Sequence, residues 1–451
     1  MIIYVKLNFA GAMEEAKKKQ TFWPGVTALG VIILFFYLFA LSFSSAPEDQ
    51  PVKLYYVDNI SQTHQKLIDR FNKKFYGQIE VVPVNLPFTK FSTNERKEIL
   101  ARSLRSKSER IDVFAVDVIW TPRFAKWSHP LDAYFSEQDT TKFLRPSLKT
   151  CLYRGHLMAA PLYLDIGLLY YRDDLLRELP DYQEIKQKLQ RRLSWREFIK
   201  LANRLKREGR PVFLFSANNF EGLMCVFYEL LTPDEIKKTF LNNPIRLNRP
   251  EISAALRHLH NLIHRYKLTP PKVTGFDEVG CYNYLLENNG YFLRGWPGFK
   301  LSVKSFNELR GTQAKIEFVE IPYFRTKKTK AVYGGWNLMI AKNSKHKKEA
   351  IKFIKFLQEL PNQKLLFTSG GYLPSLKEVY HDSLLVRRFP ALKQLHRLLL
   401  NGQHRPMRSD YTRISDILSF YFHQALKNEI GIEQALKLAE KEINTQQIIL
   451  N

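Results

Sequence analysis

The stretch Ile111-Asp112-Val113-Phe114-Ala115-Val116-Asp117 has the largely apolar composition of a buried β-strand. Such a run is typical of a strand that is covered on both faces, as in parallel sheets. Toward the N-terminus, a polar helix is expected at 95–106 and a β-branched strand at 79–84. Apolar residues at helical spacing predict an amphipathic helix at 63–75, which follows a strand at 52–57. This alternation predicts an α/β layer with a largely parallel sheet.

A second alternation of strands and helices follows in the C-terminal direction. Strands are expected at 166–171, 212–215, 316–321 and 338–341. Ser194 with Glu197 three residues later is a capping-box pattern, and the helix that it begins is expected to end at Gly209. Further helices are expected within 220–310, at 347–360 and over 411–443 with a break at Gly431. Two α/β layers predict two lobes, with a ligand at strand ends or in the cleft between lobes.

The chain is strongly basic, with 69 Lys and Arg against 44 Asp and Glu and a formal net charge of +25. The basic residues are scattered over expected helix faces, such as 186–196 and 345–348, and no zinc-finger spacing or RNA-binding motif accompanies them. A solvated basic surface is therefore expected, without nucleic acid as a partner. Aromatic residues make up 13% of the chain, which calls for a large core or an aromatic binding surface.

The N-terminal segment carries the signal for localisation. Lysines at 17–19 precede a charge-free run whose apolar centre, 26–43, has about the minimum length for spanning a bilayer. The lysines predict a cytoplasmic N-terminus and an exported remainder. The small residues at 44–46 would suit signal cleavage, whereas Pro47 directly after them would hinder it. Residues 1–46 are thus expected to be a cytoplasmic tail with either a signal peptide or a membrane anchor.

The three cysteines are Cys151, Cys225 and Cys281. None lies near the apolar segment, so no cysteine is placed for lipid attachment, and no Cys-x-x-Cys pair suggests a metal or redox centre. An odd number of cysteines in an exported protein leaves at least one free thiol. One disulfide stays possible.

Two clusters combine a carboxylate with an aromatic ring. Asp117 ends the buried strand and Trp120 follows three residues later. Tyr163 and Asp165 lie two apart, hence on one face of an extended segment. Carboxylates accept hydrogen bonds from sugar hydroxyls, and rings stack on the apolar faces of sugars. The structural alternatives are a helix-capping aspartate with a core tryptophan, and a core tyrosine beside a turn.

Three loop motifs add further candidates. Trp296 stands between glycines and a proline, as expected for a stacking platform on a shaped loop, although a packing role fits equally. Gly334 and Trp336 lie in a Gly-Gly-Trp-Asn segment whose glycines permit close approach of a ligand or a hinge rotation; an ordinary turn is the alternative. Arg405 could donate to sugar oxygens or fix a carboxylate.

Four stretches together resemble the family-1 extracellular solute-binding proteins of ABC importers, especially the trehalose/maltose-binding branch. These stretches are 155–172, 220–225, 334–344 and 370–375. The resemblance extends in order from about residue 52 to 445, and its combination of motifs is specific. Two departures are the absence of a lipid-attachment cysteine after the apolar segment and the unusually basic charge.

The resemblance implies an α/β, two-lobed periplasmic-binding-protein fold of type II, like that of maltose-binding protein, after an N-terminal apolar export or anchor helix. The lobes would be joined by three crossings, with 52–161 and 338–370 in lobe 1, and 162–333 and 371–451 in lobe 2. Residues that the resemblance implies as sugar contacts are Asp117, Tyr163, Asp165, Trp296, Gly334, Trp336 and Arg405, with Arg96 and either Asp58 or Asn59 as looser matches.

The implied function is binding, not catalysis, without a cofactor or metal. A di- or oligosaccharide would bridge Asp117 and Arg96 on one lobe to residues near the other, and the closed form would dock on the permease subunits of an ABC importer. The protein would be a monomer on the periplasmic or extracellular face, tethered by its N-terminal helix. Two alternatives stay open: a glycoside hydrolase that uses Asp117 and Asp165, and a binder of polyamine or glycerol phosphate. The identity of the sugar and of the permease is not fixed by the sequence.

Overall fold

The computed structural model describes residues 50–87, 90–91, 93–207 and 209–445. Val52–Asn451 forms a compact unit of its own, separate from Met1–Pro51. The tail and export helix expected at 1–46 lie outside the described residues. Within the described ranges, no helix combines the length and apolar character that crossing a membrane requires.

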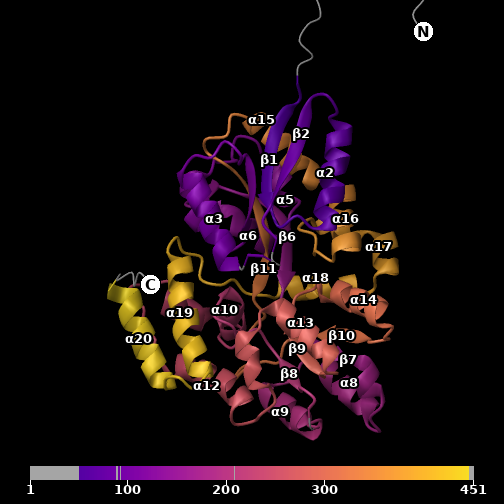
Figure 1. The fold of residues 1–451 in the computed structure, drawn as a ribbon, viewed down its shortest axis with the longest axis vertical. Helices are drawn as coiled ribbons and strands as arrows, with labels where there is room; N and C mark the ends of the chain where they lie inside the picture. Colours follow the sequence, from indigo (N-terminus) through magenta and orange to yellow (C-terminus); the bar gives the residue numbers. More distant parts are fainter. Residues whose placement is uncertain (1–49, 88–89, 92, 208, 446–451) are drawn as a thin grey trace, which may run out of the picture. The chain divides into compact units, whose positions relative to one another are not determined.

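The first sheet has five strands in the order β2-β1-β3-β11-β6 (Figure 1). Its strands are β1 (Val52–Asp58), β2 (Ile79–Asn85), β3 (Val113–Asp117), β6 (Ala160–Ile166) and β11 (Tyr333–Ile340). β1 is parallel to both β2 and β3, whereas β11 is antiparallel to both β3 and β6. The expected parallel layer is thus present, with β11 inserted against the direction of the other four strands.

Helices cover both faces of this sheet. They include α2 (Gln62–Lys74), α3 (Thr93–Arg105), α6 (Arg145–Cys151), α15 (Lys347–Leu357) and α16 (Leu360–Gly370). Figure 1 shows α2 and α3 on opposite sides of β1 and β2. The strand order accounts for this arrangement. The connection from β1 to β2 and the connection from β2 to β3 run across the sheet in opposite directions, and right-handed connections of this kind place their helices on opposite faces. α2 begins at a capping box between Ser61 and His64, and it buries Leu67, Ile68 and Phe71.

The second sheet has four strands in the order β10-β7-β9-β8. Its strands are β7 (Leu168–Arg172), β8 (Phe213–Leu214), β9 (Phe292–Gly295) and β10 (Ile316–Val319). β7 is antiparallel to β10 and β9, and β8 is parallel to β9. The second layer therefore also contains one reversed strand among parallel ones.

Helices α9 (Trp195–Arg204), α10 (Glu221–Tyr228), α12 (Pro250–Ile263), α13 (Glu278–Glu287) and α14 (Phe299–Arg310) accompany the second sheet. The capping box that begins α9 is confirmed, since the Ser194 side chain accepts from the Glu197 amide and the Glu197 side chain accepts from the Ser194 amide. The expected end of this helix was wrong, because α9 ends at Arg204 and not at Gly209.

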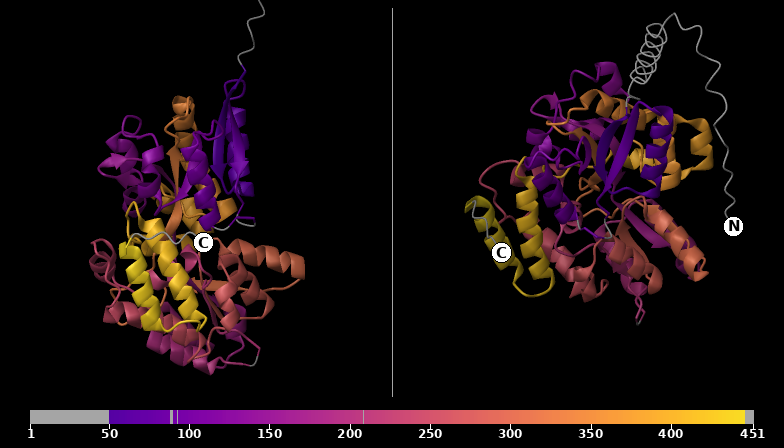
Figure 2. Two further views of the ribbon diagram at one scale, coloured as in Figure 1. Left: turned by 60° about the vertical axis from the view of Figure 1, so that its left-hand side comes forward. Right: turned by 45° about the horizontal axis from the view of Figure 1, so that its top comes forward.

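The C-terminal helices α19 (Tyr411–Leu426) and α20 (Ile432–Thr445) lie side by side (Figure 2), which confirms the break expected at Gly431. α19 also packs against α10 and α12. The remaining described elements are α4 (Thr121–Phe124), α5 (Glu137–Thr141), α7 (Asp173–Arg177), α8 (Tyr182–Gln190), α11 (Pro233–Phe240), α17 (Ser383–Arg388), α18 (Ala391–Leu400), the short hairpin β4 (Leu152–Tyr153) with β5 (His156–Leu157), and the 3-10 helices η1 (Ala125–Trp127), η2 (Pro271–Gly275) and η3 (Lys377–His381).

The chain passes directly from the first sheet to the second at Gly167, between β6 and β7. The strand expected at 166–171 is therefore the end of one strand and most of another, and the strand expected at 338–341 is the second half of β11. The lobe boundaries at 161/162 and between 333 and 338, which fall within β6 and β11, stay a prediction. The three cysteines are buried and free, so the possible disulfide does not form.

Candidate functional site

Strand register brings five of the predicted site residues onto one face of the first sheet. Trp336 in β11 lies opposite Asp117 in β3 on one side and opposite Tyr163 in β6 on the other. In the same pairing, Gly334 lies opposite Asp165. Directly opposed residues share a face of the sheet, and so do residues two apart. The carboxylates and rings recognised separately in the sequence are thus neighbours in three adjacent strands.

The two glycines of β11 are there because neighbouring atoms leave no room for a side chain. Gly335 has a φ of +116°, and a Cβ there would lie 2.4 Å from the Tyr163 carbonyl oxygen. A Cβ on Gly334 would lie 2.8 Å from the Trp296 ring. Trp296 directly follows β9 of the second sheet, so Gly334 is where that sheet's loop packs against the first sheet.

A cavity of about 700 Å³ opens at this junction and is lined by residues of both sheets and their helices. Eight of the nine predicted contact residues line it: Asn59, Asp117, Tyr163, Asp165, Trp296, Gly334, Trp336 and Arg405. Further lining residues, none of which was predicted as a ligand contact, include Glu221, Glu278, Tyr282, Tyr372, Asn218 and Asn219. The volume lies within the range of small-molecule sites in proteins.

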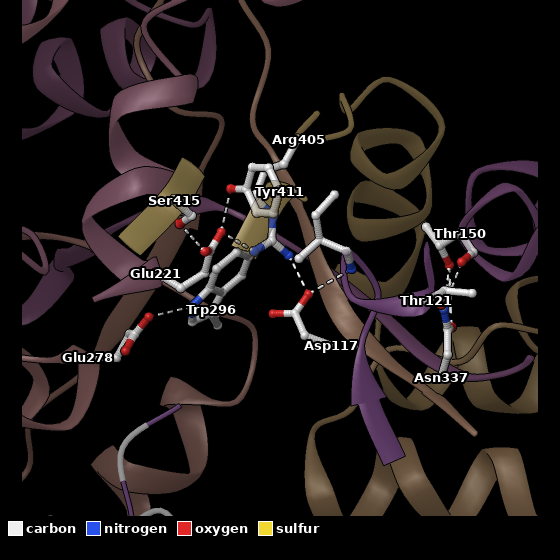
Figure 3. Close-up of polar contacts among 11 residues, drawn as sticks. Asp117, Thr121, Thr150, Glu221, Glu278, Trp296, Asn337, Arg405, Tyr411 and Ser415 are labelled. Carbon is white, nitrogen blue, oxygen red and sulfur yellow. Dashed lines mark hydrogen bonds and ion pairs between the residues drawn. The ribbon is translucent and has the colours of Figure 1, made fainter. Parts of the chain in front are cut away.

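Arg405 joins the two halves of the cavity wall (Figure 3). Its Nη2 donates to Asp117 Oδ1 and its Nη1 donates to Glu221 Oε1, both at 2.6 Å. Glu221 also accepts from the hydroxyl groups of Tyr411 and Ser415. The Arg405 side chain is 1% exposed. Its guanidinium is thus committed to two carboxylates, which is the carboxylate-fixing role among the two that the sequence left open.

Burial and the ion pair with Arg405 act on the pKa of Asp117 in opposite directions. Burial raises the pKa of Asp117, while Arg405 opposes that shift. The backbone amide of Ile119 and the guanidinium of Arg405 both donate to the same oxygen, Oδ1. The carboxylate therefore turns one oxygen toward the protein, and its half-buried position leaves the group at the cavity wall.

Trp296 is fixed by contacts on its edge and on one face. Its Nε1 donates to Glu278 Oε1 at 3.2 Å, and its backbone amide donates to the Tyr282 hydroxyl at 2.9 Å. The Arg294 guanidinium lies 3.9 Å from the ring centre and forms a buried pair with Glu229 at 2.8 Å. A ring held in this way is a preorganised stacking surface. Burial also raises the pKa of Glu278.

Arg96 packs against Trp336 and is not among the described residues that line the cavity, so its role as a sugar contact stays a prediction. Its guanidinium lies 4.5 Å from the Trp336 ring centre and 3.4 Å from Asp58 Oδ1. The buried Asp58 carboxylate, which also accepts from the Tyr56 hydroxyl at 2.6 Å, holds the guanidinium behind the ring. Of the alternatives Asp58 and Asn59, only Asn59 lines the cavity among the described residues.

Trp120 is a core residue, as the structural alternative for it stated. It is 2% exposed, and its ring meets the Trp336 ring edge to face at 5.8 Å. Just beyond Trp336, the buried Asn337 amide donates to the hydroxyls of Thr121 and Thr150, so this part of β11 is fixed by side chains as well as by strand pairing (Figure 3).

Asp165 is the unusual group of the site. Its Oδ1 is buried and accepts no hydrogen bond from any described residue. Burial raises the pKa of Asp165 to about 7, although hydrogen bonding to the Leu373 backbone lowers it in part. The rings of Tyr163 and Tyr372 meet beside it at 4.6 Å between centres; burial raises the pKa of both phenols, and the charge of Asp165 adds to that shift.

The arrangement suits recognition of a polar ligand with apolar faces. Its carboxylates and amides can accept and donate hydrogen bonds, and its rings can stack. Burial raises the pKa of the one lining thiol, Cys225, so the thiol stays protonated. Among the described residues, no three His, Cys, Asp or Glu side chains are grouped to hold a metal ion.

A cavity between two α/β layers that the chain crosses repeatedly defines a two-lobed binding protein. The family of bacterial extracellular solute-binding proteins matches residues 57–364, which is more than half of the chain. The chain therefore belongs to that family. A probable ABC transporter-binding protein of Deinococcus radiodurans is 25% identical over 420 residues, which cover 89% of this chain and 96% of the relative.

Solved structures show the same two-lobed fold. Maltose-bound MalE3 of T. maritima is 26% identical and superposes with a TM-score of 0.75, covering 88% of this chain and 100% of that one. A solute-binding protein of Thermotoga lettingae solved with α-D-tagatose is 20% identical, has a TM-score of 0.74 and covers 88% and 99% of the two chains. One from Agrobacterium radiobacter solved with ribitol is 19% identical, has a TM-score of 0.71 and covers 88% and 100%. The last two likenesses concern the fold alone.

Proposed function

We propose that this protein captures a di- or oligosaccharide in the cavity between its lobes and delivers it to an ABC importer. The observation that carries the proposal is the cavity of about 700 Å³, in which carboxylates and amides alternate with fixed aromatic rings. Sugars need both kinds of group, because hydroxyls ring their edges and apolar C–H groups form their faces. Family membership and the similarity to maltose-bound MalE3 support the same class of ligand.

The two halves of the cavity wall supply different kinds of contact to a sugar. Asp117, Tyr163 and Asp165 offer polar atoms from the first sheet, whereas Trp296 offers a ring from the loop after β9. A ligand that touches both halves stabilises the closed arrangement over an open one, because only the closed form makes both sets of contacts. Tyr163 and Asp165 act with Asp117, since all three belong to the same sheet, next to the proposed lobe boundary at 161/162.

The wider setting follows from the same proposal. The lobes would be 52–161 with 338–370, and 162–333 with 371–451, and the closed form would dock on the permease subunits. We propose that the protein acts as a monomer on the periplasmic or extracellular face and that the segment 1–46 tethers it to the membrane, with an extracellular family supporting the location.

A thermal-shift screen of the full chain tests the proposal. The panel contains mono-, di- and oligosaccharides together with spermidine and glycerol phosphate. A ligand at 100-fold over its dissociation constant stabilises the folded state by about 2.7 kcal/mol, which is readily measured. Stabilisation by a saccharide supports the proposal. Stabilisation by spermidine or glycerol phosphate alone would keep the fold and overturn the function.

The alternative of a glycoside hydrolase would use Asp117 and Asp165 as acid and nucleophile or base. Asp117 is bound to Arg405 at 2.6 Å, and the family that the chain belongs to consists of binding proteins. Release of reducing ends from an oligosaccharide by the wild type, lost in Asp165→Asn, would revive this alternative.

A further inference from the structure

The cavity wall is strongly acidic although the chain as a whole carries a formal charge of +25. Six carboxylates line the cavity against a single cationic side chain, Arg405, among the described residues. The carboxylates belong to Glu95, Asp117, Asp165, Glu221, Asp277 and Glu278. A neutral sugar needs some carboxylates as hydrogen-bond acceptors, but it supplies no charge to balance them.

The one cation of the wall is already used. Arg405 is buried between Asp117 and Glu221 and bonds to both at 2.6 Å. The nearby Arg294 guanidinium lies against the Trp296 ring and is paired with Glu229 at 2.8 Å. Neither guanidinium is therefore available to the carboxylate of Asp165.

The Asp165 carboxylate lacks a hydrogen-bond donor from the described residues at one of its two oxygens. Its Oδ1 is buried and accepts no hydrogen bond from the described residues, and the group lines the cavity. Burying such a carboxylate without a charged partner disfavours its ionised form, as its raised pKa of about 7 reflects. A sugar hydroxyl could bond to it but would return no charge, whereas a cation would favour the ionised carboxylate directly.

The phenols beside Asp165 suit a cation as well. Tyr163 and Tyr372 both line the cavity, and their ring centres lie 4.6 Å apart. Tyr372 also stacks on the His64 ring at 5.2 Å, so much of the ring faces is covered by protein, and the phenol oxygens are the groups that can accept from an ammonium group. A carboxylate with two phenols at its side thus supplies several acceptors for an ammonium group, in a cavity that also has the stacking surface of Trp296 for a sugar face.

We propose that the preferred ligand is an amino sugar, whose protonated amine is held by Asp165 beside the rings of Tyr163 and Tyr372. This inference rests on the proposed sugar-binding function and names the chemical class within it. The net charge of the chain opposes the approach of a cation at long range, but beyond about 8–10 Å that repulsion is screened at physiological salt, so the groups lining the cavity decide the affinity.

Calorimetric titration of the full chain with matched pairs tests the inference. Each pair differs by one group: glucosamine and glucose, or 2-amino-2-deoxytrehalose and trehalose, with N-acetylglucosamine as a neutral substituted sugar. At pH 7 the amino sugar of at least one pair is expected to bind about tenfold or more tightly than its hydroxyl partner, and the N-acetyl form is expected to lose that advantage.

Two variants locate the amine. In Asp165→Asn the preference for the amino sugar is expected to fall below about twofold. Glu109→Gln makes the same change of charge at a side chain that is 85% exposed, and it is expected to keep the full preference. A preference that persists in Asp165→Asn would overturn the assignment of Asp165.

The failures are distinguishable from one another. Equal or tighter binding of the neutral sugars overturns the amino-sugar inference and leaves the sugar-binding function standing. Binding of no saccharide at all overturns both. Tighter binding of spermidine than of every saccharide would also overturn both, since it would show that charge alone selects the ligand.

Discussion

Removing the charge of Asp416 is expected to shift the protein toward an open arrangement. Lys97 in α3 lies 2.7 Å from Asp416 in α19, and Asn94 in α3 donates to the same carboxylate at 3.1 Å. Arg123 adds a hydrogen bond to Thr412 at the start of α19. These contacts join helices that belong to different lobes in the proposed division, so they contribute to closure without any ligand.

The magnitude follows from the burial of the two partners. The Lys97 side chain is 3% exposed and that of Asp416 is 42% exposed. Breaking a fully buried pair costs about 3–5 kcal/mol, and an exposed pair contributes about 0–1 kcal/mol. For this mixed case we expect about 1.4 kcal/mol in Asp416→Asn, which is a tenfold change in the ratio of closed to open forms. The apparent affinity for ligand falls by the same fraction that the closed population does.

Small-angle scattering and titration calorimetry measure the two consequences. The radius of gyration of the ligand-free variant is expected to rise, and its dissociation constant to increase by up to about tenfold. Glu359→Gln is the matched control, because it removes an ion pair to Lys74 whose partners both belong to proposed lobe 1. An unchanged radius and affinity in Asp416→Asn, or a coupling with Lys97→Met below about 0.3 kcal/mol in a double-mutant cycle, would refute the reasoning.

Three further predictions concern the cavity wall. Gly334→Ala places a Cβ 2.8 Å from the Trp296 ring and is expected to weaken sugar binding at least tenfold while the protein still folds, as calorimetry and circular dichroism would show; unchanged binding would mean that the ring moves freely. Arg405→Met leaves Asp117 and a second buried carboxylate without their cation and is expected to lower the free energy of unfolding by about 3–5 kcal/mol in a denaturant titration; a loss below 1 kcal/mol would contradict the buried bridge. The pKa of Asp165 is about 7 in the folded protein and about 4 in the unfolded chain, so folding takes up a proton between these pH values. The contribution of Asp165 to the free energy of unfolding therefore falls as the pH rises from about 4 to 7. Asp165→Asn is therefore expected to gain melting temperature relative to the wild type over this range and to show a constant difference above it; parallel melting curves at pH 4 and pH 7 would contradict the raised pKa.

The sequence was informative where chemistry is local. Strand periodicity and the apolar run before Asp117 placed β1, β2 and β3 of the first sheet, and the Ser194 capping box placed the start of α9. The pair Tyr163 and Asp165 could be assigned to one face, because residues two apart in a strand always share one. The direction of β11 could not be predicted from local sequence, because its antiparallel partners β3 and β6 lie far earlier in the chain.

The rest of the site depends on side chains that meet only in the folded chain. Arg405 was recognised, but its partners Asp117 and Glu221 lie 288 and 184 residues away, so no local pattern could show that it is already bound. Arg96 was predicted as a looser match for a ligand contact, and no local pattern could show that the buried carboxylate of Asp58 lies beside its guanidinium. The stretches around Glu221 and Tyr372 were noticed for their resemblance to the family, which was the available signal that they belong to the cavity.

The central claim is that a sugar binds in the cavity beside Trp296. Isothermal titration of the full chain with the best saccharide of the thermal-shift screen, in the wild type and in Trp296→Ala, tests it most directly. We predict one site per chain and a dissociation constant that rises by about 100-fold or more in the variant, since the ring supplies the fixed stacking surface of the wall. Equal affinity in both proteins would contradict the account, because the sugar would then bind elsewhere.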